Sequence, residues 1–202
     1  MFKKLAGLIA IAGLFLSGMA SAQIAGTDHD LRGQPGAGGE VCVVCHTPHN
    51  ADTSVTNAPL WDHELTVASF TPYISPTLDA TVGQPTGGSR LCLSCHDGTV
   101  AIDSFGGRTG TNIIGAGGLI GDDLSDDHPI SFVYDTALAT SDGGLFDPAT
   151  ALSGLGGTIN DDMLFAGNLQ CGSCHDVHDD SNAPFLRMTN DASAMCFTCH
   201  DK

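Results

Sequence analysis

The sequence predicts a mostly irregular, loop-rich chain with short α-helices and few or no strands. Glycine contributes 26 of the 202 residues, and nearly all the acidic residues are aspartate, the shorter and more turn-forming carboxylate. Both features disfavour long helices. The eight cysteines fall into four pairs of fixed spacing, which indicates that covalently held groups organise the chain in place of a large apolar core.

The first 22 residues have the pattern of a cleaved secretory signal peptide. Lys3 and Lys4 give a positive start, residues 5–16 are apolar, and residues 20–22 (Ala-Ser-Ala) form a typical cleavage site before Gln23. This segment is too short to span a membrane, and no later stretch approaches the roughly 18 consecutive apolar residues that a spanning helix needs. We therefore expect an exported protein without a membrane span, outside the cell or at its surface or, alternatively, in the periplasm.

The remaining residues, 23–202, have the length of a single domain and are strongly acidic. The whole sequence carries 23 acidic and 7 basic residues, a formal net charge of −16, so nucleic acid and anionic membranes are poor partners. Calcium could bind the paired aspartates, but no loop has the spacing of a defined calcium site, and we interpret these pairs as solvated surface. They are Asp122-Asp123, Asp126-Asp127, Asp161-Asp162 and Asp179-Asp180.

All eight cysteines lie in Cys-x-x-Cys pairs, and a histidine directly follows each pair. The cysteines are Cys42, Cys45, Cys92, Cys95, Cys171, Cys174, Cys196 and Cys199, and the histidines are His46, His96, His175 and His200. Disulfides or zinc would be the ordinary interpretations of such pairs in an exported chain. The added histidine makes the pattern the attachment signature of haem c: two thioethers fix the porphyrin, and the adjacent imidazole binds iron as the proximal ligand. We therefore expect four covalently bound haem c groups, with the stacked haems acting as the core.

Each iron has a second axial position, and the remaining histidines can fill it. They are His29, His49, His63, His128 and His178. Methionine is the competing ligand, but Met163, Met188 and Met195 are too few for four irons. We interpret His29 and His128 as ligands because four irons need partners. His63 lies between two carboxylates and is interpreted as the surplus histidine, solvated or structural.

The first and third motifs extend to Cys-x-x-Cys-His-x-x-His. His49 follows His46 by three residues, and His178 follows His175 in the same way. Residues three apart on a helical turn point to the same side, so the second histidine should bind a different iron from the first. Each of these turns would therefore hold two haems close together.

A second repeat accompanies these turns. Asn57-Ala58-Pro59-Leu60 follows the first motif, and Asn182-Ala183-Pro184-Phe185 follows the third. The chain therefore resembles two copies of a two-haem module, at about residues 23–105 and 166–202. A glycine- and aspartate-rich middle joins them and is where we expect any short strands.

These motifs together resemble the tetrahaem extracellular c-type cytochromes of the OmcE type, which polymerise into conducting filaments. The resemblance rests on residues 42–51, 58–61, 93–98, 124–129 and 171–178, and it runs from about His29 to the C-terminus. It implies distal ligands at His29, His49, His128 and His178. It also implies that one haem at the subunit boundary takes its sixth ligand from the neighbouring subunit. By similarity we assign this donor to His49, with the acceptor a haem near the far end of the next copy.

Two electron-transfer functions follow, and an enzyme is disfavoured. One is a filament subunit that passes electrons to other redox cytochromes or to extracellular acceptors. The alternative is a monomeric periplasmic shuttle. The filament is favoured by the resemblance and by the scarcity of lysine, since Lys202 is the only lysine after residue 22 and no lysine patch is available for docking on acidic partners. An enzyme would need an open iron position, whereas the histidines suffice to close all four.

Overall fold

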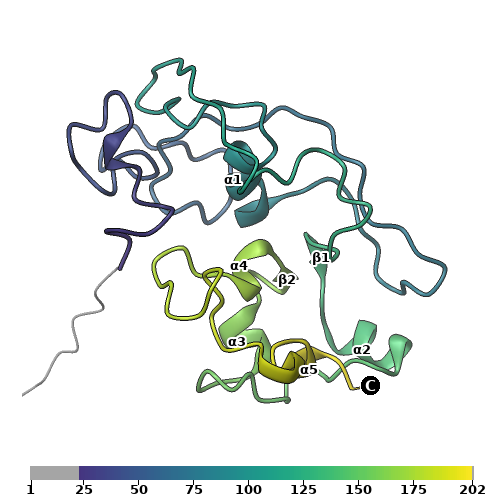
Figure 1. Ribbon diagram of the computed structural model, residues 1–202. Coiled ribbons are helices and arrows are strands. Elements are labelled where there is room, and N and C mark those ends of the chain that lie inside the picture. Colours follow the sequence, from purple (N-terminus) through teal and green to yellow (C-terminus); the bar gives the residue numbers. More distant parts are fainter. Residues whose placement is uncertain (1–22, 202) are drawn as a thin grey trace, which may run out of the picture.

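The computed structural model describes residues 23–201, so the predicted signal peptide lies outside the described residues (Figure 1). Most of the described chain is loop, which confirms the loop-rich fold class. The helices are α1 (Gly87–His96), α2 (Thr136–Asp142), α3 (Ile159–Met163), α4 (Cys171–Cys174) and α5 (Cys196–Cys199), with short 3-10 turns at Leu31–Gly33 and Asp191–Ser193. The strands are β1 (Phe132–Val133) and β2 (Asn168–Leu169).

The two strands form a small antiparallel ribbon. Phe132 lies opposite Leu169, and Val133 lies opposite Asn168. Phe132 and Leu169 are buried in an apolar cluster that also contains Tyr134, Ile159 and Met163. Because β2 ends two residues before α4 begins, the ribbon fixes the position of the third motif relative to the middle of the chain.

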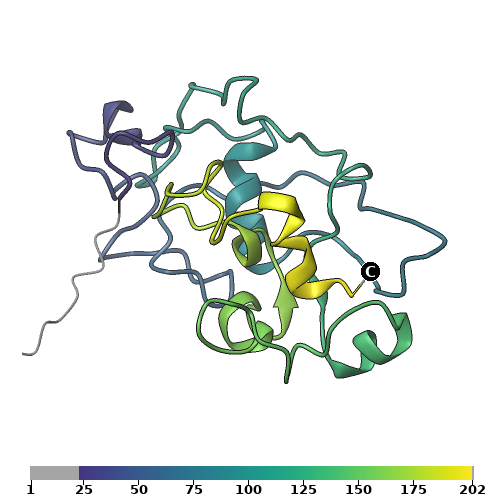
Figure 2. The same cartoon turned by 60° about the horizontal axis from the view of Figure 1, so that its bottom comes forward.

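The two halves of the chain lie on opposite sides of a helical contact. In Figure 1 the loops of the N-terminal half surround α1 in the upper part of the view, and α2 to α5 occupy the lower part. α1 packs against α4, and α4 packs against α3. The turned view in Figure 2 shows α4 and α5 in front of α1. Two of the motif-bearing helices, α1 and α4, therefore meet where the two halves of the chain come together.

The motif turns share one backbone hydrogen bond. The N–H of each histidine after the pair donates to the carbonyl of the first cysteine, as in His46 to Cys42 (2.9 Å), His175 to Cys171 (3.0 Å) and His200 to Cys196 (2.9 Å). The expectation of a helix is wrong for the first motif, which forms only this turn.

Helix α4 has a starting contact that the first motif lacks. The Gln170 N–H donates to the Ser173 hydroxyl at 2.9 Å, whereas Val44, at the position of Ser173, has no oxygen to accept such a bond.

Among residues 23–201, no helix is both long enough and apolar enough to cross a membrane.

Candidate functional site

Backbone carbonyls orient three of the four motif histidines. The Nδ1 of His46 lies 2.5 Å from the Pro59 carbonyl oxygen, that of His96 lies 2.5 Å from Gly118, and that of His175 lies 3.0 Å from Pro184. A carbonyl can only accept, so Nδ1 carries the proton in each ring. This tautomer leaves Nε2 free as the metal-binding nitrogen, and such outer contacts also fix the plane of the ring.

Histidine rings from distant parts of the sequence face one another in three pairs. The ring centroids are 6.0 Å apart for His29–His96, 6.2 Å for His46–His178 and 6.3 Å for His128–His200. A metal–imidazole bond of about 2 Å places two rings on opposite faces of one metal with centroids roughly 6 Å apart. Each pair therefore leaves the space that one axially ligated iron requires.

Two histidines of the predicted set have no such partner. Within residues 23–201, no ring contact joins His49 or His175 to another histidine. Both are exposed. His175 is held by Pro184 as described above, whereas His49 contacts only its own turn, where its N–H donates to the Thr47 hydroxyl (3.3 Å). The structure thus brings three pairs of candidate ligands together inside the chain and leaves His49 and His175 unpaired with any other histidine ring among the described residues.

His29 lies in a partly buried environment that suits a neutral ligand. Burial, followed by repulsion from His96, lowers the pKa of His29, which favours the uncharged imidazole that binds metals. Phe185 packs edge-on against the ring at 4.6 Å. The Nδ1 of His29 and the Nε1 of Trp61 are buried without a hydrogen-bond partner. Unpaired buried polar atoms are rare, and both lie beside motif turns, as expected where a bound group completes the site.

A hollow of about 930 Å³ opens beside the first motif. Its volume is within the range of sites that hold large ligands. His49 lines it and His46 does not. The other lining residues include Val43, Trp61, His63, Phe105 and Arg108.

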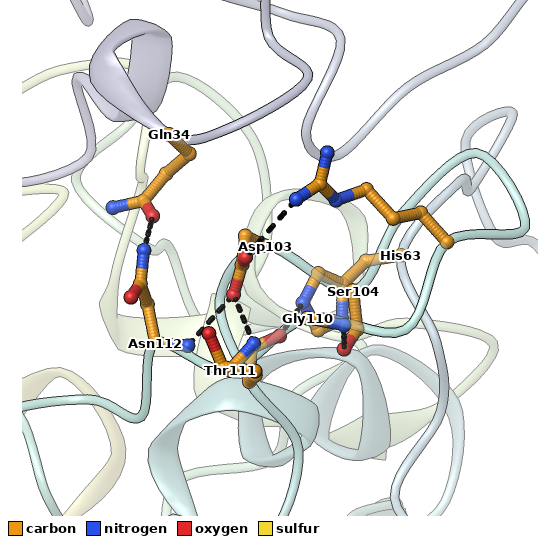
Figure 3. Close-up of polar contacts among 9 residues, drawn as sticks. Gln34, His63, Asp103, Ser104, Gly110, Thr111 and Asn112 are labelled. Carbon is orange, nitrogen blue, oxygen red and sulfur yellow. Dashed lines mark hydrogen bonds and ion pairs between the residues drawn. The ribbon is translucent and has the colours of Figure 1, made fainter.

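The loop from Asp103 to Asn112 forms one wall of this hollow, and Asp103 holds the loop in shape (Figure 3). Its buried carboxylate accepts the N–H groups of Thr111 and Asn112 at 2.8 Å each and lies 3.8 Å from the Arg108 guanidinium. These two backbone bonds are the main reason that the pKa of Asp103 is lowered. Gly110 is required here because an added Cβ would lie 2.2 Å from the carboxylate.

Comparison with known protein families gives a match for the part of the chain that contains the third and fourth motifs. Residues 164–202 match the family described as the doubled CXXCH motif. The motif indicates a multihaem c-type cytochrome. The curated proteins contain no match to the chain.

None of the eight cysteines, all of which lie among the described residues, is joined in a disulfide. Among residues 23–201, which include the four aspartate pairs, no group of three or more His, Cys, Asp or Glu side chains is placed to hold a metal ion. Seven of these eight aspartates are exposed, and Asp162 is half-buried.

His63 is not a solvated histidine, which corrects one of the two expectations for it. Its side chain is 2% exposed, and its ring nitrogens lie 2.8 Å from the Glu64 carbonyl oxygen and 2.9 Å from that of Ala101. Its Nε2 is also 3.5 Å from the Cys95 sulfur. The structural interpretation agrees with these contacts, because His63 connects two loops beside the second motif.

The two repeat segments, at residues 57–60 and 182–185, hold the first and third motif turns in shape, a role that was not predicted from the sequence. Besides binding the histidine Nδ1 through Pro59 and Pro184, they close their turns with matching backbone bonds. Thr47 N–H donates to Leu60 (2.9 Å), and Asp176 N–H donates to Phe185 (2.8 Å). The repeat itself was the available signal, since a proline at a fixed place in both copies points to a shared contact.

Proposed function

We propose that this cytochrome is an electron-transfer subunit with four haem c groups, and that His49 of one copy binds a haem of the next copy to form an extracellular filament. One observation carries the proposal. Three pairs of histidines face each other within the chain at the separation required by one iron, while His49 and His175 remain apart and exposed.

The ring pairs support a specific ligand assignment. His46 and His178 would hold the haem attached at Cys42 and Cys45, His96 and His29 the second, and His200 and His128 the fourth. His175 would hold the third haem from its proximal side. When bound, each haem supplies one-electron redox chemistry. Histidine on both axial positions leaves no place for a substrate on iron, which supports electron transfer and not catalysis.

His49 is the donor that remains for the third haem. It cannot act within its own turn on the iron of His46, since His178 faces that histidine. A ligand given by one copy to a different surface of the next is a heterologous contact, and such contacts propagate into helical filaments when the rotation does not close. His49 lines an open hollow. The unpaired N–H of Trp61 and the cationic Arg108 line the same hollow and could receive the carboxylates of an incoming haem.

The alternative function, a monomeric shuttle, requires a different ligand arrangement only at His49 and His175. A shuttle uses the same three internal pairs, but must close the iron of the third haem within one chain or leave it five-coordinate. The proposal of the filament is supported by the absence, among the described residues, of a ring contact between His49 and His175.

Electron microscopy of the secreted, haem-loaded protein tests the proposal directly. We expect long filaments of uniform width, with every haem six-coordinate by resonance Raman spectroscopy. Dissociation of the filaments should convert one haem in each chain to a five-coordinate, high-spin form. Discrete single-chain particles in which all haems are six-coordinate would refute the filament and establish the shuttle.

A further inference from the structure

The contact between α1 and α4 brings together the attachment points of two haems. Cys92 lies on α1, and Cys171 is the first residue of α4. The two thiols interact, and this interaction raises the pKa of Cys92 and lowers that of Cys171 to about 7. Once haems are attached, both sulfurs are thioethers that no longer titrate, and the contact then places two attachment points side by side.

A buried polar contact beside these sulfurs connects the two helices. The backbone N–H of Ser89 on α1 donates to the Gln170 side-chain oxygen at 3.1 Å. In return, the Cys171 N–H donates to the Ser89 hydroxyl at 3.0 Å. Ser89 is 0% exposed and Gln170 is 4% exposed. We call this set the Ser89–Gln170 contact.

Neighbouring groups complete the contact. The Ser131 hydroxyl lies 3.2 Å from the same Gln170 oxygen and accepts the Thr86 N–H at 3.0 Å. Gly87, at the start of α1, has a φ of +52°, and an added Cβ would lie 3.2 Å from the Gln170 side-chain nitrogen. The start of α1, the residue before β1 and the start of α4 therefore meet at one glutamine.

Such a contact fixes orientation more strictly than an apolar one. Hydrophobic contact is non-directional, so apolar helices can slide or rotate with little loss. A buried N–H that loses its partner is left unsatisfied in a low-dielectric interior, which penalises any rotation of α1 against α4. Because the Cys171 N–H belongs to an attachment residue, the restraint acts directly where a haem joins the chain.

We propose that Ser89 and Gln170 are positioning residues that fix the haem at Cys92 and Cys95 relative to the haem at Cys171 and Cys174. They thereby set the electronic coupling between the two haems, which falls steeply with separation and depends on mutual angle. The proposal rests on the proposed function, since it requires haems at both motifs.

Two matched serine variants of the full, haem-loaded protein provide the test. Ser89→Ala removes the hydroxyl that accepts the Cys171 N–H. Ser94→Ala is the control, because Ser94 is also on α1 and 0% exposed, but its hydroxyl bonds the Thr66 N–H (3.0 Å) and the Arg90 carbonyl (2.8 Å) instead of α4. The readout is the exciton couplet in the Soret circular dichroism, which reports distance and angle between haems.

We expect Ser89→Ala to lose roughly half of the couplet amplitude, with haem content and low-spin six-coordination unchanged, and Ser94→Ala to retain it. If Ser89→Ala does not load, Ser131→Ala should give a smaller loss of the same sign. An unchanged couplet in the loaded serine variants, or an equal loss in Ser94→Ala, would overturn the positioning role. Failure of the wild-type protein to carry haem at either motif, measured by mass spectrometry, would overturn the proposed function together with it.

Discussion

The turn at residues 42–61 and the turn at residues 171–186 have nearly the same backbone contacts and different surroundings. In both, a proline carbonyl orients the first histidine and the next N–H closes the turn. The second histidine of the later turn, His178, faces His46 across 6.2 Å. His49, at the same place in the earlier turn, is exposed beside an open hollow. Two turns with matching backbone contacts therefore place their second histidines in different surroundings, because position in the fold decides what the second histidine meets.

Removing His49 tests this comparison with the largest expected effect. His49→Ala should abolish filaments, because the third haem loses its donor from the neighbouring copy, while the three internal pairs stay six-coordinate. Electron microscopy and resonance Raman spectroscopy of the same sample measure both. Thr53→Ala, an exposed neighbour on the same loop that does not line the hollow, should assemble normally. Intact filaments from His49→Ala would refute its assignment as the shared ligand.

The matching change in the later turn should affect ligation without affecting assembly. His178→Ala opens the distal position of the iron held by His46, so one haem in four should become high-spin in the electron paramagnetic resonance spectrum. Filaments should persist because His49 and His175 are untouched. Loss of filaments in this variant, with no high-spin haem, would reverse the roles assigned to the two histidines.

The residues three positions after Leu60 and Phe185 should differ in how much they contribute to the stability of the fold. Counting onward from Leu60 and Phe185, His63 in the first segment corresponds to Met188 in the second. His63→Met should lower the free energy of unfolding by about 1–3 kcal/mol, since the Glu64 and Ala101 carbonyls lose a partner next to buried side chains. Denaturant titration of the loaded protein measures this. An unchanged midpoint would mean that these contacts contribute nothing.

The smallest effects should have opposite signs in the two turns. Leu60 (φ 54°) and Phe185 (φ 59°) both have the left-handed conformation that favours glycine. Leu60 is 58% exposed, so Leu60→Gly should raise stability by up to about 1 kcal/mol. Phe185 packs against His29, so Phe185→Gly should lower stability by about 1–2 kcal/mol. Parallel thermal denaturation of both variants checks the signs, and equal shifts would contradict the difference in packing.

The attachment turns could be predicted from the sequence because haem attachment is a local pattern, complete within five residues. The loop-rich fold class could be predicted as well, since the abundance of glycine acts on every segment. The candidate distal histidines could be chosen from the sequence, but they could not be paired with their motif histidines. The ring opposite His46 belongs to His178, near the other end of the chain, and no spacing rule connects the two.

Other features needed three-dimensional contacts. The carboxylates beside His63 suggested exposure, yet the backbone turns its ring inward between two loops. Ser89 and Gln170 carry no sequence signal, because serine and glutamine are common on surfaces and only their burial between α1 and α4 gives them a role.

The buried thiols have a consequence for the order of assembly. In every motif, burial is the main cause that raises the pKa of the second cysteine. The pKa is about 11 for Cys45 and Cys199 and about 12 for Cys95, and that of Cys174 is raised as well. A thiol held protonated in this way is a poor nucleophile toward the haem vinyl group. We therefore expect attachment to take place before these thiols become buried. In the proposed ligand assignment, the haem at Cys42 and Cys45 would keep one free axial position until His178, near the other end of the chain, packs opposite His46.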